Sequence, residues 1–300
     1  MAFGLLRMAF FMPAAETVRI ASFTVPYDIT QKLESNDLQK LYNENPTGFR
    51  DYMLKESRDL PDIMFEKSRQ EARSGAKIVA WSEGALFIGK ETESAITDRA
   101  SKLAAEQKIY LLITLAVAPK DFPKQLLENK VIWISPSGEI LGEYLKSKPV
   151  PGEGCIKGTG IAPILETPYG RLSSVICFDM DFPTFVRGIA KDSIDLMIVP
   201  SADWKEIDPL HTHMIMFRSV ENGFSMVRAT SKGLSAAYDY QGRVLSSKDY
   251  FADKDQSLIS DVPVKGVTTV YSRSASGSSL VNSRSSKYLF KFDSKSLKNE

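Results

Sequence analysis

Three side chains whose types suit acyl-transfer chemistry stand at the ends of predicted strands, and the first is a cysteine. Cys177 ends the apolar run 172–177 and is followed at once by acidic residues and Pro183. This pattern predicts a buried strand that stops at the thiol, with a helix beginning near Phe182. Ligands of open α/β sheets sit at such strand ends. Because a thiolate attacks and a thiol hardly does, Cys177 can act as a nucleophile if a base and a cation lie near it.

Two other strand ends offer the base and the cation. Glu83 leaves the apolar run 77–82 beside a glycine that lets the chain turn, and Lys146 ends the run 142–146. The loop after Lys146 contains two prolines and a further carboxylate, Glu153. Taken singly, each charged residue is typical of a solvated strand end, and a lone cysteine is most often a small buried hydrophobe. Together they supply a base, a cation and a thiol.

The three motifs resemble those of a known family. Residues 81–83 (Trp-Ser-Glu), 144–146 (Tyr-Leu-Lys) and 176–179 (Ile-Cys-Phe-Asp) are similar, in this chain order, to the Glu-Lys-Cys motifs of the nitrilase superfamily of carbon–nitrogen hydrolases. Glu153 stands where many members carry a second glutamate. The resemblance extends over residues 18–262 and makes acyl chemistry on a carbon–nitrogen bond the expected activity.

Later residues are similar to one branch of that superfamily. Residues 217–223 and 227–235 most resemble the branch that contains apolipoprotein N-acyltransferase. The chain departs from that branch at two places: the loop before Glu153 is one residue shorter, and Asp179 replaces a glutamate. These departures weaken the correspondence at Glu153 most.

The resemblance implies a role for each residue. Cys177 would attack the acyl carbon, and Glu83 would take its proton and return it to the leaving group. Lys146, helped by the backbone N–H of Phe178, would neutralise the oxyanion. Glu153 would orient the lysine or the acceptor.

A second lysine and four pocket residues complete the predicted site. Lys148 is an alternative cation, because alternation along a strand would put it on the same face as Lys146. We favour Lys146, since it carries the family's Tyr-x-Lys spacing and Pro149 indicates that the strand has ended. The predicted substrate pocket comprises Phe178, Asp179, Asp203 and Trp204.

Composition excludes several kinds of partner. The 300 residues include 38 basic and 37 acidic ones, so no electrostatic footprint for nucleic acid exists, and no nucleic-acid partner is expected. His211 and His213 lie two residues apart on a predicted helix and face different ways, so we expect no metal. No glycine-rich phosphate loop occurs, and no cofactor is expected.

The two cysteines, Cys155 and Cys177, are expected to stay free, because a large core needs no disulfide.

Three segments are predicted. Residues 1–16 form an apolar leader or the remnant of a membrane segment; the run 1–13 is shorter than the roughly 20 residues of a spanning helix, but it could bring the chain close to a membrane. Residues 17–271 form the nitrilase-like domain, and 272–300 form a Ser/Lys-rich extension. The location stays open: cytoplasmic for a free-standing hydrolase, membrane-attached for part of an acyltransferase-like chain.

Strands alternate with helices and hairpins along the chain, which predicts an α/β fold with a mixed sheet. The resemblance sharpens this to a nitrilase-like four-layer α-β-β-α sandwich that forms a homodimer. We interpret the protein as a thiol-dependent carbon–nitrogen hydrolase acting on a small amide, nitrile or other acyl donor. The alternatives are acyl transfer from phospholipid to an amine and a catalytically silent binding domain with the same fold.

Overall fold

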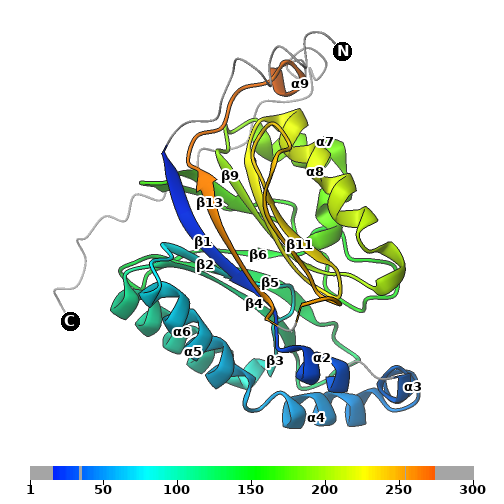
Figure 1. The fold of residues 1–300 in the computed structure, drawn as a ribbon. Helices are drawn as coiled ribbons and strands as arrows, with labels where there is room; N and C mark the ends of the chain where they lie inside the picture. The colour runs from blue at the N-terminus through cyan, green and yellow to red at the C-terminus, as the bar shows by residue number, and fades with distance from the viewer. Residues whose placement is uncertain (1–15, 34–35, 254, 274–300) are drawn as a thin grey trace, which may run out of the picture.

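Two β-sheets lie face to face between outer layers of helices, so the predicted α-β-β-α sandwich is confirmed (Figure 1). The structure is a computed structural model that describes residues 16–33, 36–253 and 255–273. The predicted leader 1–16 lies outside these ranges except for Glu16, and the predicted extension 272–300 lies outside them except for residues 272 and 273. Within the described residues, no helix is long and apolar enough to cross a membrane.

The first sheet has the order β13-β1-β2-β4-β5-β6, with β3 also paired to β4. The strands β1, β2 and β4 run parallel to one another, whereas β5, β6 and β13 pair antiparallel. Their bounds are β1 (Thr17–Phe23), β2 (Ile78–Trp81), β3 (Leu86–Gly89), β4 (Tyr110–Ala118), β5 (Glu128–Ile134), β6 (Ile140–Leu145) and β13 (Ser257–Pro263).

The second sheet has the order β12-β11-β10-β9-β8-β7, in which β8, β9 and β10 are parallel. Its strands are β7 (Ile164–Thr167), β8 (Gly170–Ser174), β9 (Leu196–Ala202), β10 (Ser225–Ser231), β11 (Leu234–Tyr238) and β12 (Val244–Asp249). Parallel strands that are buried on both faces consist of nearly continuous apolar residues, so they can be predicted from the sequence.

Helices cover the outer face of each sheet (Figure 1). The amphipathic helices α5 (Leu60–Arg73) and α6 (Glu93–Gln107) pack on the first sheet, and α7 (Pro183–Ala190) and α8 (Leu210–Asn222) pack on the second. The remaining helices are α2 (Tyr27–Leu33), α3 (Asn36–Glu44), α4 (Pro46–Glu56), α9 (Val270–Arg273) and the short η1 (Lys90–Thr92), η2 (Cys177–Asp181) and η3 (Lys205–Ile207).

The core is apolar, and the indole N–H groups of two buried tryptophans in it are paired. Trp133 on β5 is fully buried, and its indole N–H donates to Ser174 Oγ on the opposite sheet at 2.8 Å. Trp81 is likewise buried, with its N–H donating to Ser68 Oγ at 2.9 Å. Satisfying these groups avoids the cost of about 1–3 kcal/mol that an unpaired buried donor carries.

Two sequence predictions need correction. The strand expected to end at Cys177 is shorter: β8 ends at Ser174, and the thiol residue begins η2. The segment 27–56, for which no element was predicted, forms helices α2 to α4. The helices α3 and α4 pack on each other, and α4 also contacts β3.

Candidate active site

Glu83 lies just beyond β2, where the chain turns through Gly84 with φ of +58°. Glycine adopts this left-handed conformation without the steric cost that a Cβ imposes. The Glu83 side chain is 6 % exposed. Its Oε1 accepts hydrogen bonds from Lys146 Nζ and Asn129 Nδ2, both at 2.7 Å, and its Oε2 accepts one from the Ala202 N–H at 3.0 Å. The Glu83 carboxylate, which follows a strand of the first sheet, is therefore bonded to the backbone of the second sheet.

Lys146 follows the last residue of β6 and is buried. Its Nζ lies 2.7 Å from Glu83 Oε1 and 2.8 Å from Glu153 Oε1. Burial alone would lower the pKa of Lys146, but the charges of Glu83 and Glu153 outweigh it, so the pKa is raised well above its ordinary value. The ammonium is thus a permanent positive charge between two carboxylates.

Asn129 on β5 holds the two carboxylates in place, and sequence analysis missed it. Its Nδ2 donates to Glu83 Oε1 at 2.7 Å and to Glu153 Oε1 at 3.0 Å. The Asn129 carbonyl also accepts from the Lys146 N–H at 2.9 Å. Asn129 is one of three polar residues that begin β5 before its apolar part, so nothing in the local sequence distinguishes it. Glu153 is fixed further by the Val150 N–H, which donates to its Oε2 at 2.8 Å.

Cys177 is the first residue of η2, and its φ of +45° is unusual for a residue with a side chain. Its side chain is buried, and the S–H donates to the Ala202 carbonyl at 3.7 Å. Burial raises the pKa of the Cys177 thiol most, and the Glu83 carboxylate adds to this, while Lys146 and Arg228 oppose it. The resting group is therefore a neutral thiol.

Ala202 connects the thiol to the carboxylate. Its carbonyl accepts from Cys177 and its N–H donates to Glu83. A single residue at the end of β9 thus touches a group from each sheet. The structure brings Glu83, Lys146 and Glu153 into direct contact and places Cys177 beside Ala202 at the same strand ends.

Asp179 lies in the protein interior, and all of its contacts are internal. Its Oδ1 accepts from the N–H groups of Ser147 (3.1 Å) and Lys148 (2.7 Å), and its Oδ2 accepts from Tyr144 Oη (2.7 Å) and the Ile176 N–H (3.0 Å). These bonds join the turn at the cysteine to the loop after the lysine. A role of Asp179 in the pocket wall stays a prediction.

The other predicted residues lie around this cluster. The Lys148 ammonium stands over the rings of Phe182 and Phe185, 5.2 and 5.7 Å from their centroids. The Phe178 ring packs edge-on against Phe182. Trp204 is exposed at 46 %. Lys148 thus contacts aromatic rings, whereas Lys146 contacts the two carboxylates.

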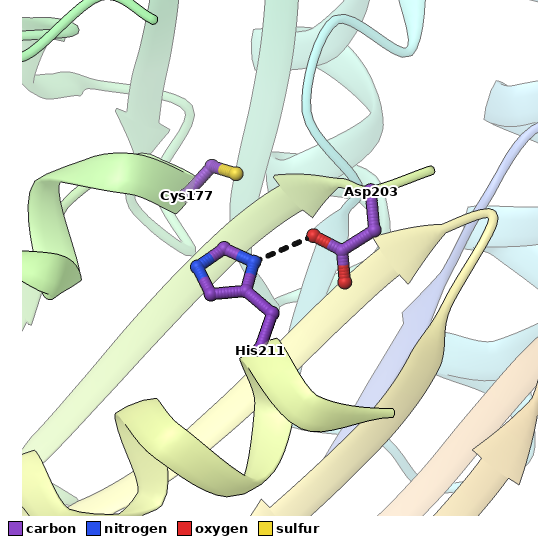
Figure 2. Close-up of side chains that lie close together, drawn as sticks. All are labelled: Cys177, Asp203 and His211. Carbon is purple, nitrogen blue, oxygen red and sulfur yellow. Dashed lines mark hydrogen bonds and ion pairs between the residues drawn. The ribbon is translucent and has the colours of Figure 1, made fainter. Parts of the chain in front are cut away.

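Asp203 forms a second polar cluster on another side of Cys177 (Figure 2). Its Oδ1 lies 2.7 Å from His211 Nδ1 and accepts a hydrogen bond from Arg228 at 2.7 Å. Burial would raise the pKa of Asp203, but the bonds from His211 and Arg228 hold it below its ordinary value. Arg228 thus pairs with Asp203, whereas Arg218 of α8 pairs with Glu221.

Cys177, Asp203 and His211 offer sulfur, oxygen and nitrogen atoms within 4.8 Å of one another, as a metal site would. The Arg228 guanidinium, however, lies 2.7 Å from the Asp203 oxygen and 3.0 Å from His211 Nδ1. A permanent cation at this distance repels a metal ion strongly in a buried site. We therefore do not identify the group as a metal centre.

A cavity of about 100 Å³ lies beside Glu83. Apolar side chains and hydroxyl groups make up most of its wall, and the lining includes Val25, Thr30, Met53, Ser57, Leu60, Phe87 and Ser231. A space of this size accommodates a small organic group.

The fold is an α-β-β-α sandwich, and a glutamate, a lysine and a cysteine lie near the ends of its strands. This combination agrees with the class of acyl-processing enzymes that the sequence motifs indicated. Residues 60–270 match the model of the carbon-nitrogen hydrolase family, so the chain belongs to that family. The predicted membership of the nitrilase superfamily is confirmed.

Comparison with individual proteins agrees with this. The chain is 28 % identical over 198 residues to apolipoprotein N-acyltransferase of Pseudomonas putida (58 % of this chain, 39 % of the relative) and 28 % identical over 216 residues to that of Azotobacter vinelandii (64 % and 41 %). It therefore spans about two fifths of the length of these relatives. An amidase from Nesterenkonia sp. has the same fold, with a TM-score of 0.62 at 18 % identity over 88 % of this chain and 95 % of the amidase.

Proposed function

We propose that the chain is a thiol-dependent carbon–nitrogen hydrolase that works through an acyl-enzyme on Cys177. The observation that carries the proposal is the buried Lys146 ammonium, 2.7 Å from Glu83 and 2.8 Å from Glu153. Burying several charges together is costly and rarely improves stability over an apolar core. Ionisable groups gathered this way at strand ends are more typical of catalytic sites.

Acylation uses the thiol and the carboxylate. The raised pKa of Cys177 means that its proton must be removed as the sulfur attacks. Glu83 takes that proton, directly or through a water molecule, and then donates it to the amine as the carbon–nitrogen bond breaks. The products are a thioester on Cys177 and a free amine. Lys146 stabilises the oxyanion, together with the N–H of Phe178 in the first turn of η2, where N–H groups lack an acceptor within the helix.

Deacylation repeats the steps with water. Glu83 removes a proton from the attacking water, the thioester carbon–sulfur bond breaks, and the proton returns to the Cys177 sulfur. Glu153 and Asn129 hold the charged groups in position: Glu153 accepts a hydrogen bond from Lys146, and Asn129 donates one to Glu83. The cavity that Glu83 lines has room for a small amide or nitrile, although Cys177 and Lys146 do not line it.

A second candidate is acyl transfer to an amine instead of water. It is supported by the match to apolipoprotein N-acyltransferases over 198 to 220 residues. The thioester would be the same, but an amine nitrogen would attack it. A catalytically silent domain with this fold is the third reading, and it predicts an unreactive Cys177.

Mass spectrometry of the intact protein separates the candidates. We expect incubation with a small amide to yield an acyl adduct on Cys177 that water discharges, and Cys177→Ala to yield none. A long-chain adduct formed from phospholipid vesicles that persists until an amine is added would instead establish acyl transfer. No adduct from any donor, with Cys177 no more reactive than a free thiol, would refute both enzymatic readings.

A further inference from the structure

A polar cluster that the proposed mechanism does not use lies against the thiol of Cys177. Figure 2 shows His211, from α8, between the turn that carries Cys177 and the loop that carries Asp203. The ligating atoms of these three residues lie within 4.8 Å of one another. Glu83 and Lys146 are not part of this cluster, so two separate groups of charges act on the thiol.

Both ring nitrogens of His211 face carboxylates. Nδ1 lies 2.7 Å from Asp203 Oδ1, and Nε2 lies 2.9 Å from Asp181 Oδ1. Only an imidazolium can donate to both, because a neutral ring has one N–H. Burial alone would lower the pKa of His211, but the hydrogen bonds to Asp181 and Asp203 outweigh it and raise the pKa above its ordinary value.

The cluster around the thiol is balanced in charge when His211 is protonated. Two carboxylates, from η2 and from the loop after β9, oppose two cations, from α8 and β10. The titratable or charged groups that face His211 or its partners are Asp181 and Cys177 of η2, Asp203 after β9, Arg228 of β10, Tyr238 of β11 and Asp208 before α8.

Among the described residues, Arg228 is the one donor that a neutral His211 ring could accept from at Nδ1. Its guanidinium lies 3.0 Å from His211 Nδ1 and donates to Asp203 at 2.7 Å. A neutral ring can therefore accept from Arg228 at Nδ1 and still donate to Asp181 at Nε2. Loss of the proton would, however, leave two acceptors, His211 Nδ1 and Asp203 Oδ1, facing each other at 2.7 Å, so the geometry favours the imidazolium.

We propose that His211 is a positioning residue for the reaction of Cys177: as an imidazolium held by Asp203 and Asp181, it balances the charge beside the thiol and so sets how readily the thiolate forms. This inference rests on the proposed nucleophilic role of Cys177. Without the imidazolium, the carboxylates of Asp203 and Asp181 would outnumber the Arg228 cation, and the nearer one, Asp203, within 4.8 Å of the sulfur, would oppose a second negative charge there.

The test measures the rate of Cys177 alkylation by iodoacetamide, with no substrate present. Peptide mass spectrometry distinguishes Cys177 from Cys155, the second free cysteine. We expect His211→Gln to slow alkylation of Cys177 by about tenfold at about pH 7, which corresponds to one pKa unit of the thiol. His213→Gln is the matched control, since His213 is exposed on the same helix and is the only other histidine in the chain. It should leave the rate unchanged.

Charge-balance variants separate this role from a structural one. Asp181→Asn removes one negative charge at a partly exposed site and should speed alkylation several-fold relative to the wild type. The double variant His211→Gln/Asp181→Asn restores the balance, and its rate should return to within about threefold of the wild-type rate. Because a packing defect at His211 would not be repaired by a second substitution, recovery identifies charge as the cause.

The inference is overturned if Asp181→Asn does not speed alkylation, or if the double variant is as slow as His211→Gln. Asp181→Asn tests it even if His211→Gln does not fold. A different result refutes the proposed function: if Cys177 forms no acyl-enzyme, that function is wrong whatever the alkylation rates of the variants are.

Discussion

The carboxylate of Asp179 accepts a hydrogen bond of 2.7 Å from the backbone N–H of Lys148, and so links the two sheets of the sandwich. Lys148 belongs to the loop that leaves β6, and Asp179 belongs to η2, which follows β8. The lysine and the cysteine of the candidate site are each two residues away from this contact. Their relative position therefore depends on it.

We expect Asp179→Asn to lower both stability and turnover. Four donors point at the two carboxylate oxygens, so an amide would turn its own donor toward another donor. The free energy of unfolding should fall by about 1–3 kcal/mol in a urea titration. Asp59→Asn, at an exposed site before α5, is the control and should change stability by less than about 0.5 kcal/mol. Equal effects of the two variants would contradict the role of Asp179.

Substitution of Lys146 should lower kcat far more than substitution of Lys148. Lys146→Met leaves the buried carboxylates of Glu83 and Glu153 without their cation and removes the charge that would face the oxyanion. We expect kcat of the folded variant to fall by at least about 10²-fold. Lys148→Met removes only a cation over aromatic rings, so kcat should stay within about threefold of the wild type. The reverse ranking would reassign the oxyanion charge to Lys148.

Gly158 supports the end of the lysine strand. A Cβ at this position would lie 2.1 Å from the Leu145 carbonyl oxygen, and the Gly158 N–H donates to the Lys146 carbonyl at 2.8 Å. Gly158→Ala should therefore displace the backbone at Lys146, lower kcat and lower the melting temperature. Gly188→Ala is the matched control, because no atom lies within 4 Å of its Cβ and alanine favours a helix by up to about 1 kcal/mol. A Gly158→Ala protein with unchanged kcat would rule out this support.

The pH dependence of stability should reveal the environment of Cys155. Burial, with a smaller contribution from Glu153, raises the pKa of this thiol from 9.0 to about 12. Above pH 9.0 the thiol ionises in the unfolded chain but not in the folded one, so its stabilising contribution is complete below pH 9.0 and is lost as the pH rises toward 12. The unfolding free energy of the wild type should thus fall more steeply above pH 9.0 than that of Cys155→Ala, by up to about 1.4 kcal/mol per pH unit. Urea titrations at several pH values measure both slopes, and identical slopes would contradict the raised pKa.

Sequence alone determined the layers of the fold and the three motifs. Buried parallel strands appear as continuous apolar runs, and the polar residues that end them stand out by contrast. Glu83 follows such a run, so its position could be predicted locally, whereas Lys146 follows the antiparallel, partly exposed β6 and Cys177 lies three residues beyond β8. The family motifs then predicted which of them work together, and the matching family model confirms the family.

Only the tertiary structure decided which polar groups meet. Asn129 bridges two carboxylates 46 and 24 residues away, and His211 reaches Asp181 30 residues away. The strand β13 pairs with β1 across more than two hundred residues of chain. Sheet order and register bring these residues together, and neither is encoded in the local spacing of apolar and polar side chains. The charge balance beside Cys177 is consequently a property of the packed sheets and α8, because four groups from separate segments must come within hydrogen-bond distance before their charges act on one another.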